Sequence, residues 1–279
     1  MLDKVQRIAA FSDGNSGGNP ADVYIADEQP SVESMQSIAA EVGYSETAFA
    51  APIPSGWKVR YFAPESEVPF CGHATIALGA ALTQQNGDGV FALTLNETEI
   101  TVEGWAHGNG FSAALQSPKT HSMAAESSHV DSALKLFGYT RKDLDPKIPP
   151  AFANGGANHL IIGLNSRQAL RDMSYEFSAG RDFMNQSKLV TVMFVYAQSD
   201  QQFHSRNPFA SGGVYEDPAT GAATAAFAGY LRDIGWPHNG VINLVQGEDM
   251  GIRSLIRAEL TNESGASIRV SGNARVISC

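Results

Sequence analysis

The sequence has no long apolar run and very little cysteine. No segment approaches the roughly 18 consecutive apolar residues of a membrane-spanning helix, and the first twenty residues contain no apolar run of signal-peptide length. The two cysteines, Cys71 and Cys279, are too few for a disulfide framework. We therefore expect a cytoplasmic protein that has no membrane segment and does not depend on disulfides.

Clusters of positive charge are also missing. Acidic residues outnumber Lys and Arg by 29 to 19, so a nucleic-acid backbone would be repelled, and we expect no nucleic-acid partner. Only 17% of the residues are charged and 43% are hydrophobic, which is typical of a folded chain. A length of 279 residues is enough for one large domain or two small ones.

Short β-rich runs, separated by Gly, Asn and Pro, dominate the chain. Fewer stretches favour helix, and the first of them has Ser31 as a candidate N-cap with Glu33 in its first turn. This mixture predicts an α+β fold rather than an alternating βαβ chain. The expected strands lie within residues 56–63, 89–104, 159–164 and 189–197, and the expected helices within 31–43, 73–84 and 222–235.

An internal repeat is the most informative pattern. The segment EVPFCGHATIALGAAL (67–82) aligns without a gap on EDPATGAATAAFAGYL (216–231). The identical pairs are Glu67/Glu216, Pro69/Pro218, Gly72/Gly221, Ala74/Ala223, Thr75/Thr224, Ala77/Ala226 and Leu82/Leu231. We interpret this as a duplication, although two Ala-rich core helices that each follow a Pro and a Gly would give a similar match.

A duplication would place the two repeated helices at the centres of two similar domains related by a pseudo-twofold axis. Their first turns would then face each other across the domain cleft, and each would offer unpaired N–H groups and the positive end of a helix dipole. Such a pair of ends suits an anion. Glycine at Gly72 and Gly221 lets a ligand approach the backbone closely, so both are candidate substrate-binding residues.

Four motifs resemble the phenazine biosynthesis PhzF-like proteins of the diaminopimelate epimerase-like superfamily. They are GGNPADV (17–23), GYSETAF (43–49), VRYFAPESEVPFCGHAT (59–75) and GVYEDPATGAA (213–223), and their order and spacing match that family. The resemblance implies an α+β fold with two domains, each a barrel-like β-sheet around a central helix. It also implies an active site between the domains and a homodimer.

From this resemblance we predict an N-terminal half at 1–118 and a C-terminal half at 119–265, with the last strand, 266–279, returning to the first half. Residues 115–129, rich in Ser, Pro and Ala, are the candidate crossover. The glycine-rich stretch SDGNSGGNP (12–20) lacks the strand-to-helix setting of a nucleotide fingerprint. We therefore expect no cofactor, and read this stretch as a turn.

Glu46 and His73 are the first two candidate catalytic residues. Glu46 lies among Ser45, Tyr44 and Phe49, where a carboxylate in a partly dry cleft suits general acid/base chemistry; an ordinary glutamate at a strand start is the alternative. The resemblance implies that Glu46 is the acid/base, with Ser45 beside the substrate. It also implies that His73 contacts substrate from a helix start, whereas local backbone bonding is the alternative role for this imidazole.

No metal is expected at His73, because no second Cys or His stands at a ligand spacing from the CGH motif. A Cys71–His73 nucleophile pair is also disfavoured, because residues two apart near a helix start point in different directions. A small buried residue is the expected role of Cys71.

Asp217 is the third candidate catalytic residue. The pair Asp-Pro alone would indicate only a turn before a helix, but the resemblance implies that Asp217 holds substrate and shapes the proton path. The family usually has Ser after EDPATG, whereas this chain has Ala222. Ala222 is a candidate substrate contact through its backbone, and the missing hydroxyl puts turnover of the phenazine precursor in doubt.

The expected reaction follows from one further position. Epimerases of the superfamily use two cysteines at the paired helix starts, but this chain has Cys71 and Thr220, and a threonine hydroxyl is a very poor base. We therefore predict an isomerase in which Glu46 alone moves a proton between carbons of a small, cyclic or amino, carboxylate. The alternatives are an epimerase or dehydratase that uses Cys71 as its base, and a non-catalytic carboxylate-binding protein.

Overall fold

The computed structural model describes residues 4–96, 98–108 and 110–277. Its contacts divide the chain into unit 1, which runs to Gln116 and resumes at Ser271, and unit 2, Ser117–Val270. The chain thus changes unit inside the segment that we considered as the crossover. The terminal Cys279 lies outside the described residues. Within the described ranges, no helix has the length and apolar character needed to cross a membrane.

Unit 1 is a closed barrel of eight strands. Around the barrel the order is β17–β1–β2–β3–β4–β6–β7–β8, and β8 pairs again with β17. The pairs β2–β3 and β4–β6 are parallel, and β5 is a short addition to β4. The strands are β1 (Val5–Ala10), β2 (Asn19–Ile25), β3 (Thr47–Ile53), β4 (Gly56–Phe62), β5 (Glu67–Val68), β6 (Gly89–Thr94), β7 (Glu99–His107), β8 (Gly110–Gln116) and β17 (Arg269–Val276).

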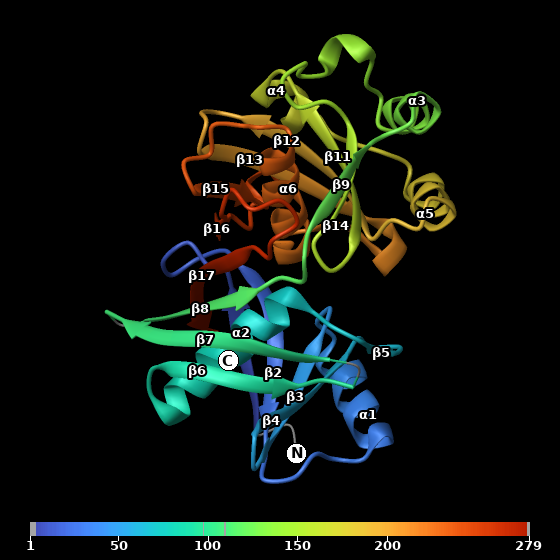
Figure 1. Ribbon diagram of the computed structural model, residues 1–279. Coiled ribbons are helices and arrows are strands. Elements are labelled where there is room, and N and C mark those ends of the chain that lie inside the picture. The colour runs from blue at the N-terminus through green and yellow to red at the C-terminus, as the bar shows by residue number, and fades with distance from the viewer. Residues whose placement is uncertain (1–3, 97, 109, 278–279) are drawn as a thin grey trace. The chain divides into compact units, whose positions relative to one another are not determined.

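The helix α2 (Gly72–Asn86) forms the centre of this barrel (Figure 1). It packs against β1, β2, β7 and β8, and every side chain from His73 to Thr83 is buried. A helix buried all round needs small residues where the wall is close. A Cβ added at Gly79 would stand 2.6 Å from a methyl group of Val102, so glycine permits the approach.

The helix α1 (Val32–Val42) covers the outside of unit 1. Its N-cap is Ser31, whose hydroxyl accepts from the N–H of Ser34, as the sequence predicts. It ends at Gly43, which has φ of 76° and therefore favours glycine. Its own Met35, Ile38 and Ala39 pack against Tyr24, Phe49 and Phe62 of the strands. This packing identifies the outer face of strands β2, β3 and β4.

Unit 2 repeats the connections of unit 1. The run β10–β11–β12–β13–β15–β16 alternates antiparallel and parallel pairs in the same order as β1–β2–β3–β4–β6–β7, and β14 adds to β13 as β5 does to β4. The duplication read from the sequence is present in the fold. The strands are β9 (His121–Ala124), β10 (Ala151–Asn154), β11 (Asn158–Leu164), β12 (Thr191–Ala197), β13 (Gln202–Phe209), β14 (Val214–Asp217), β15 (Val241–Gln246) and β16 (Ser254–Glu259).

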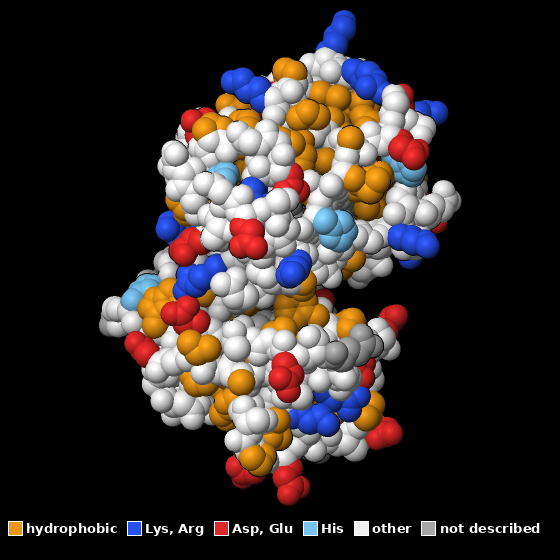
Figure 2. Space-filling view, in the orientation of Figure 1, with side chains coloured by type: hydrophobic (Ala, Val, Ile, Leu, Met, Phe, Trp, Pro, Cys, Tyr) orange, Lys and Arg blue, Asp and Glu red, His pale blue; other side chains and the backbone are white. Residues whose placement is uncertain are grey.

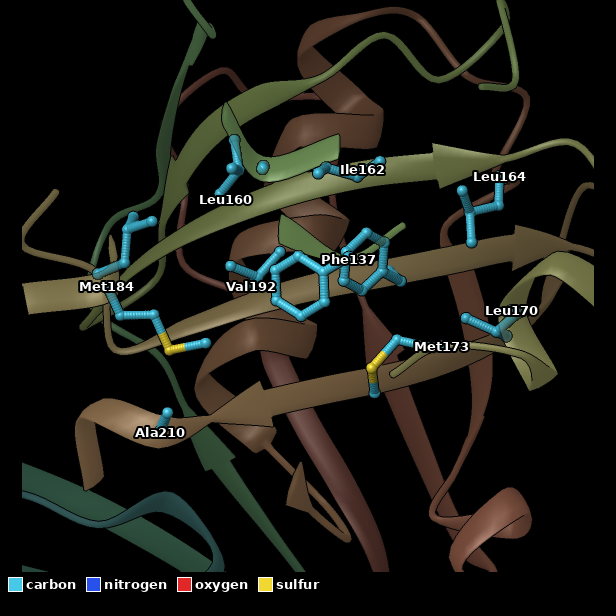
Figure 3. Packing of buried hydrophobic residues seen from close by; sticks show 12 residues of the cluster. Phe137, Leu160, Ile162, Leu164, Leu170, Met173, Met184, Val192 and Ala210 are labelled. Atoms are coloured by element: carbon cyan, nitrogen blue, oxygen red, sulfur yellow. The ribbon is translucent and has the colours of Figure 1, made fainter. Parts of the chain in front are cut away.

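The helix α6 (Gly221–Asp233) is the counterpart of α2, and its residues from Ala223 to Arg232 are buried. A Cβ at Gly229 would stand 2.4 Å from Thr120 Oγ1, the same kind of close approach as at Gly79. The outer face of the unit is covered by α3 (Ser127–Leu136), α4 (Arg167–Arg171) and α5 (Phe177–Gln186). Figure 3 shows the side chains between these helices and the strands, among them Phe137, Met173 and Met184.

The visible surface has no cluster of positive charge, as the sequence indicates. On the face drawn in Figure 2, Lys and Arg side chains are scattered among Asp and Glu. Among the described residues, further short helices are η2 (Arg141–Asp143), η3 (Ala210–Gly212) and η4 (Glu248–Met250). The glycine-rich stretch after β1 forms a tight turn in which Asp13 and Ser16 pair through their backbones.

Candidate active site

Glu46 is held at the junction between α1 and β3. The left-handed Gly43 ends the helix, three residues follow, and β3 begins at Thr47. The carbonyl of Glu46 accepts from the N–H of Asp22 at 3.3 Å, which fixes its backbone to β2. The side chain of Glu46 is only 14% exposed. Its carboxylate is therefore largely shielded from water.

His73, in the first turn of α2, joins three side chains. Its Nε2 lies 3.4 Å from Glu46 Oε2 and 3.3 Å from Ser45 Oγ, and its Nδ1 lies 3.4 Å from Cys71 Sγ. The imidazole is 8% exposed. The Nε2 atom is within hydrogen-bonding distance of the Ser45 hydroxyl, while Glu46 Oε2 has no hydrogen-bond partner among the described residues. One imidazole thus lies between a carboxylate and a thiol.

This arrangement corrects one expectation from the sequence. Residues 71 and 73 do not point apart, because Cys71 is the N-cap with extended backbone, φ −140° and ψ 117°, while His73 is already helical. The change of backbone conformation between them turns both side chains to the same side. Cys71 is buried, as predicted, but it contacts the imidazole rather than apolar side chains alone.

Glu46, Cys71 and His73 also form a cluster whose potential ligand atoms lie within 4.8 Å of one another. The thiol faces Nδ1 of the ring and the carboxylate faces Nε2, whereas a metal ion binds to one ring nitrogen. The cluster suits proton transfer through the imidazole better than it suits ion binding. That the reaction needs no metal stays a prediction.

The start of α2 presents uncapped backbone donors. The Cys71 side chain makes no capping hydrogen bond, and the Cys71 carbonyl accepts from the hydroxyl of Thr75 at 2.7 Å. Tyr61, deep in the barrel, contacts the same Thr75 hydroxyl. Gly72 is the first helical residue, one residue before the start that the sequence predicts. The first turn of a helix without a side-chain cap retains the positive end of its dipole for a ligand.

Asp217 belongs to a second polar group, in unit 2. It ends β14, is 8% exposed, and accepts a short hydrogen bond from the hydroxyl of Thr220, the N-cap of α6. The amide of Gln246 donates to the Asp217 carbonyl at 2.7 Å and to Thr220 Oγ1 at 3.0 Å, and its oxygen accepts from the Thr220 N–H at 3.1 Å. The Thr220 hydroxyl is therefore engaged with Asp217, and Gly221 and Ala222 begin the helix.

Sequence reasoning missed Gln246 and two ion pairs on the strands of the two units. Arg60 on β4 binds Glu67 on β5, and Arg206 on β13 binds Glu216 on β14, each through two nitrogens. Glu67 and Glu216 are one of the identical pairs of the repeat, so that alignment could have suggested a common role. No pattern in the sequence distinguishes Gln246, on β15, from any other strand residue.

Together, the fold and these residues define two units with the same strand connections, each with a buried central helix and polar residues at the helix start. The family model described as phenazine biosynthesis-like protein matches residues 8–278, and the chain belongs to this family. The fold is diaminopimelate epimerase-like, as we expected.

Relatives in sequence agree with this assignment, and solved structures agree with the fold. The trans-2,3-dihydro-3-hydroxyanthranilate isomerase of Pseudomonas aeruginosa is 29% identical, covering 95% of this chain and 94% of its own. An uncharacterized isomerase of Mesorhizobium japonicum is also 29% identical, covering 95% and 93%. A PhzF-family protein of Bacillus anthracis has a TM-score of 0.86 at 20% identity, covering 98% and 96%. A probable proline racemase of Agrobacterium radiobacter has a TM-score of 0.66 at 11% identity, covering 98% and 90%.

The predicted site residues thus form two groups. Ser45, Glu46, Gly72 and His73 belong to unit 1, and the contacts of His73 join Ser45 to Glu46. The second group, which consists of Asp217, Gly221 and Ala222, belongs to unit 2. That both groups act on one substrate stays a prediction.

Proposed function

We propose that the protein is an isomerase that moves a proton between two carbons of a small carboxylate, with Glu46 as the general acid/base. Its relatives are named isomerases, which supports this class of reaction. The observation that carries the role of Glu46 is its shielded carboxylate, held 3.4 Å from His73 Nε2. A carboxylate in this setting can take up a proton and keep it from exchanging quickly with water.

In the proposed reaction, Glu46 removes a proton from one carbon and the electron pair of that C–H bond shifts into the adjacent double bond system. The same proton is returned to the far carbon, so the substrate is isomerised without net gain or loss of protons or electrons. His73 lies against the carboxylate and holds it toward the substrate. The start of α2 supplies backbone N–H groups for the substrate's own carboxylate.

The test is a screen of cyclic and amino-acid carboxylates in deuterated water, read by NMR for isomerisation and by mass spectrometry for label uptake, which should be small if the shielded Glu46 returns the same proton. It should include trans-2,3-dihydro-3-hydroxyanthranilate, the compound in the name of the Pseudomonas relative. Glu46→Gln should lower turnover at least about 10²-fold, because the amide cannot accept the proton. Glu41→Gln, an exposed change in the preceding helix, is the matched control and should have no effect. Full turnover by Glu46→Gln would exclude the single-glutamate mechanism.

The epimerase alternative also has a specific observation in its favour. Cys71 Sγ lies 3.4 Å from His73 Nδ1, so the imidazole can accept the thiol proton and leave a thiolate base. In that case exchange at a substrate α-carbon should disappear in Cys71→Ser and persist in Glu46→Gln.

A substitution at Ala222 narrows the range of possible substrates. Ala222→Ser restores the hydroxyl that is usual in the family, so turnover of the dihydro-hydroxyanthranilate should rise if the natural substrate resembles it. No turnover of that compound by either form would indicate a different acid.

A further inference from the structure

Unit 1 contains a cavity that the proposed reaction does not use. Its volume is about 620 Å³, and it is lined by the glycine-rich turn after β1, by the adjoining ends of β7 and β8, and by β17 with Ile277. The described lining residues include neither His73 nor the three side chains that contact it. A cavity of this size can hold a small organic molecule.

Backbone hydrogen bonds hold the walls of this cavity in place. The N–H of Ser12 donates to the carbonyl of Asn273 at 2.9 Å, which joins the glycine-rich turn to β17. Within the turn, Asp13 and Ser16 each donate an N–H to the carbonyl of the other. These segments are therefore ordered without a ligand, so a ligand would not have to order them on binding.

The unused polar groups of the cavity can all donate hydrogen bonds. Ser12 is 1% exposed, and its hydroxyl has no hydrogen-bond partner among the described residues. The Arg275 guanidinium donates to the carbonyl of Gly17 at 3.3 Å, but its buried Nε has no partner in the described part of the chain. The Asn273 oxygen accepts from the Ser112 hydroxyl at 2.9 Å, and its amide N–H groups are not used in this contact. Buried donors without a partner cost free energy, so these groups call for an acceptor.

The charge and the apolar part of the lining narrow the class of ligand. Arg275 carries the only permanent charge among the described lining residues, although the chain as a whole has a net charge of -10. One guanidinium balances one negative charge, and its Nε–H suits a carboxylate oxygen. Phe111, Val276 and Ile277 supply apolar surface in the same lining. The ligand that fits is therefore a single carboxylate on an apolar body.

We propose that this cavity is a second small-molecule site, which binds a monocarboxylate with an aromatic or aliphatic body. Arg275 and Ser12 hold the carboxylate, and the apolar side chains of the lining contact the body. The site does not depend on the reaction proposed for Glu46. Because the turn after β1 and β17 both contribute to it, a bound ligand links the last strand of the barrel to the first and should raise the thermal midpoint.

Crystals grown with 6-bromo-2-naphthoate test the location, because anomalous scattering from bromine marks the position of the ligand. We expect the carboxylate at Arg275 and the ring system against Phe111. The matched neutral compound, 6-bromo-2-naphthamide, should not occupy the cavity. Bromine found only beside His73, or nowhere in the protein, would overturn the proposal, and so would equal occupancy of the cavity by the amide.

A titration with the same naphthoate, followed by NMR at the amides of residues 273–277, measures affinity for this site in solution. Arg275→Met should weaken binding at least about tenfold, because hydrogen bonds to charged groups contribute more than neutral ones. Ser12→Ala, which removes one atom, should weaken it about threefold. Lys58→Met removes an exposed positive charge from β4 of the same unit and is the matched control, with unchanged affinity expected. Natural affinity in either folded variant, Arg275→Met or Ser12→Ala, would refute the proposed contacts.

Discussion

Removing Arg206 should destabilise the protein far more than removing Arg60, although the two arginines occupy equivalent positions in the repeat. Arg206 and Glu216 have side chains that are 10% and 2% exposed, whereas Arg60 and Glu67 are 17% and 27% exposed. Arg206→Met leaves the Glu216 carboxylate charged, buried and unpaired. It also removes the donors to the carbonyls of Arg171 and Met173.

The expected cost follows from the burial of the partner left behind. Breaking a buried ion pair on one side costs about 3–5 kcal/mol, so Arg206→Met should lower the free energy of unfolding by about 4 kcal/mol. Arg60→Met leaves Glu67 within reach of water, and Asn96 still donates to that carboxylate at 2.6 Å. Its cost should be about 1 kcal/mol, close to that of an exposed pair.

Urea unfolding, followed by far-UV circular dichroism, measures both costs as shifts of the transition midpoint. The double variant Arg206→Met/Glu216→Leu serves as the control, because it removes the unpaired charge along with the pair. It should recover most of the stability lost in the single variant. Equal costs for Arg206→Met and Arg60→Met would refute the reasoning, since burial would then not decide the energy of these pairs.

Two buried ionisable residues should give opposite pH dependences. Burial raises the pKa of Asp22 to about 6, above the unfolded value of about 3.9. The free energy of unfolding should therefore fall by about 3 kcal/mol between pH 4 and 6, as Asp22 ionises. Asp22→Asn should be more stable than the natural protein at pH 8, as urea unfolding would measure. Burial lowers the pKa of His159 to about 3, so stability should fall as the pH drops from 6.5 to 3, and His159→Gln should flatten this slope in acid-unfolding curves; an unchanged slope would contradict the burial argument. Alanine normally stabilises a helix relative to glycine, but Gly79→Ala should lower the thermal midpoint, because its Cβ would meet the barrel wall at 2.6 Å; a higher midpoint would show that the wall yields.

Local features of the fold were predictable from the sequence because they depend on neighbouring residues. The cap at Ser31, the turn after β1 and the starts of α2 and α6 follow from residue types at short spacing. The repeat allowed a prediction for the whole molecule, because two aligned helical segments imply two domains of similar fold around them. The family resemblance then supplied the barrel, which no local pattern specifies.

The relations that the sequence did not reveal connect distant residues. The contact between Cys71 and His73 depends on a change of backbone conformation at the helix start, which spacing alone does not indicate. Gln246 is 26 residues from Thr220 in the chain, and Asp22 is 24 residues from Glu46. Strand pairing brings such residues together, so these contacts can be identified only when the register of the sheet is known.

The closure of the first barrel by β17 has a consequence for biosynthesis. The strand pairs with β1 in the register Ala10↔Ala274, across more than 260 residues of chain, and completes the ring between β8 and β1. On the ribosome, the strands of residues 117–270 emerge before this last strand does. The barrel of unit 1 is synthesised first but cannot close before β17 is available. We therefore expect unit 2 to complete its fold before unit 1, which is the reverse of the order of translation.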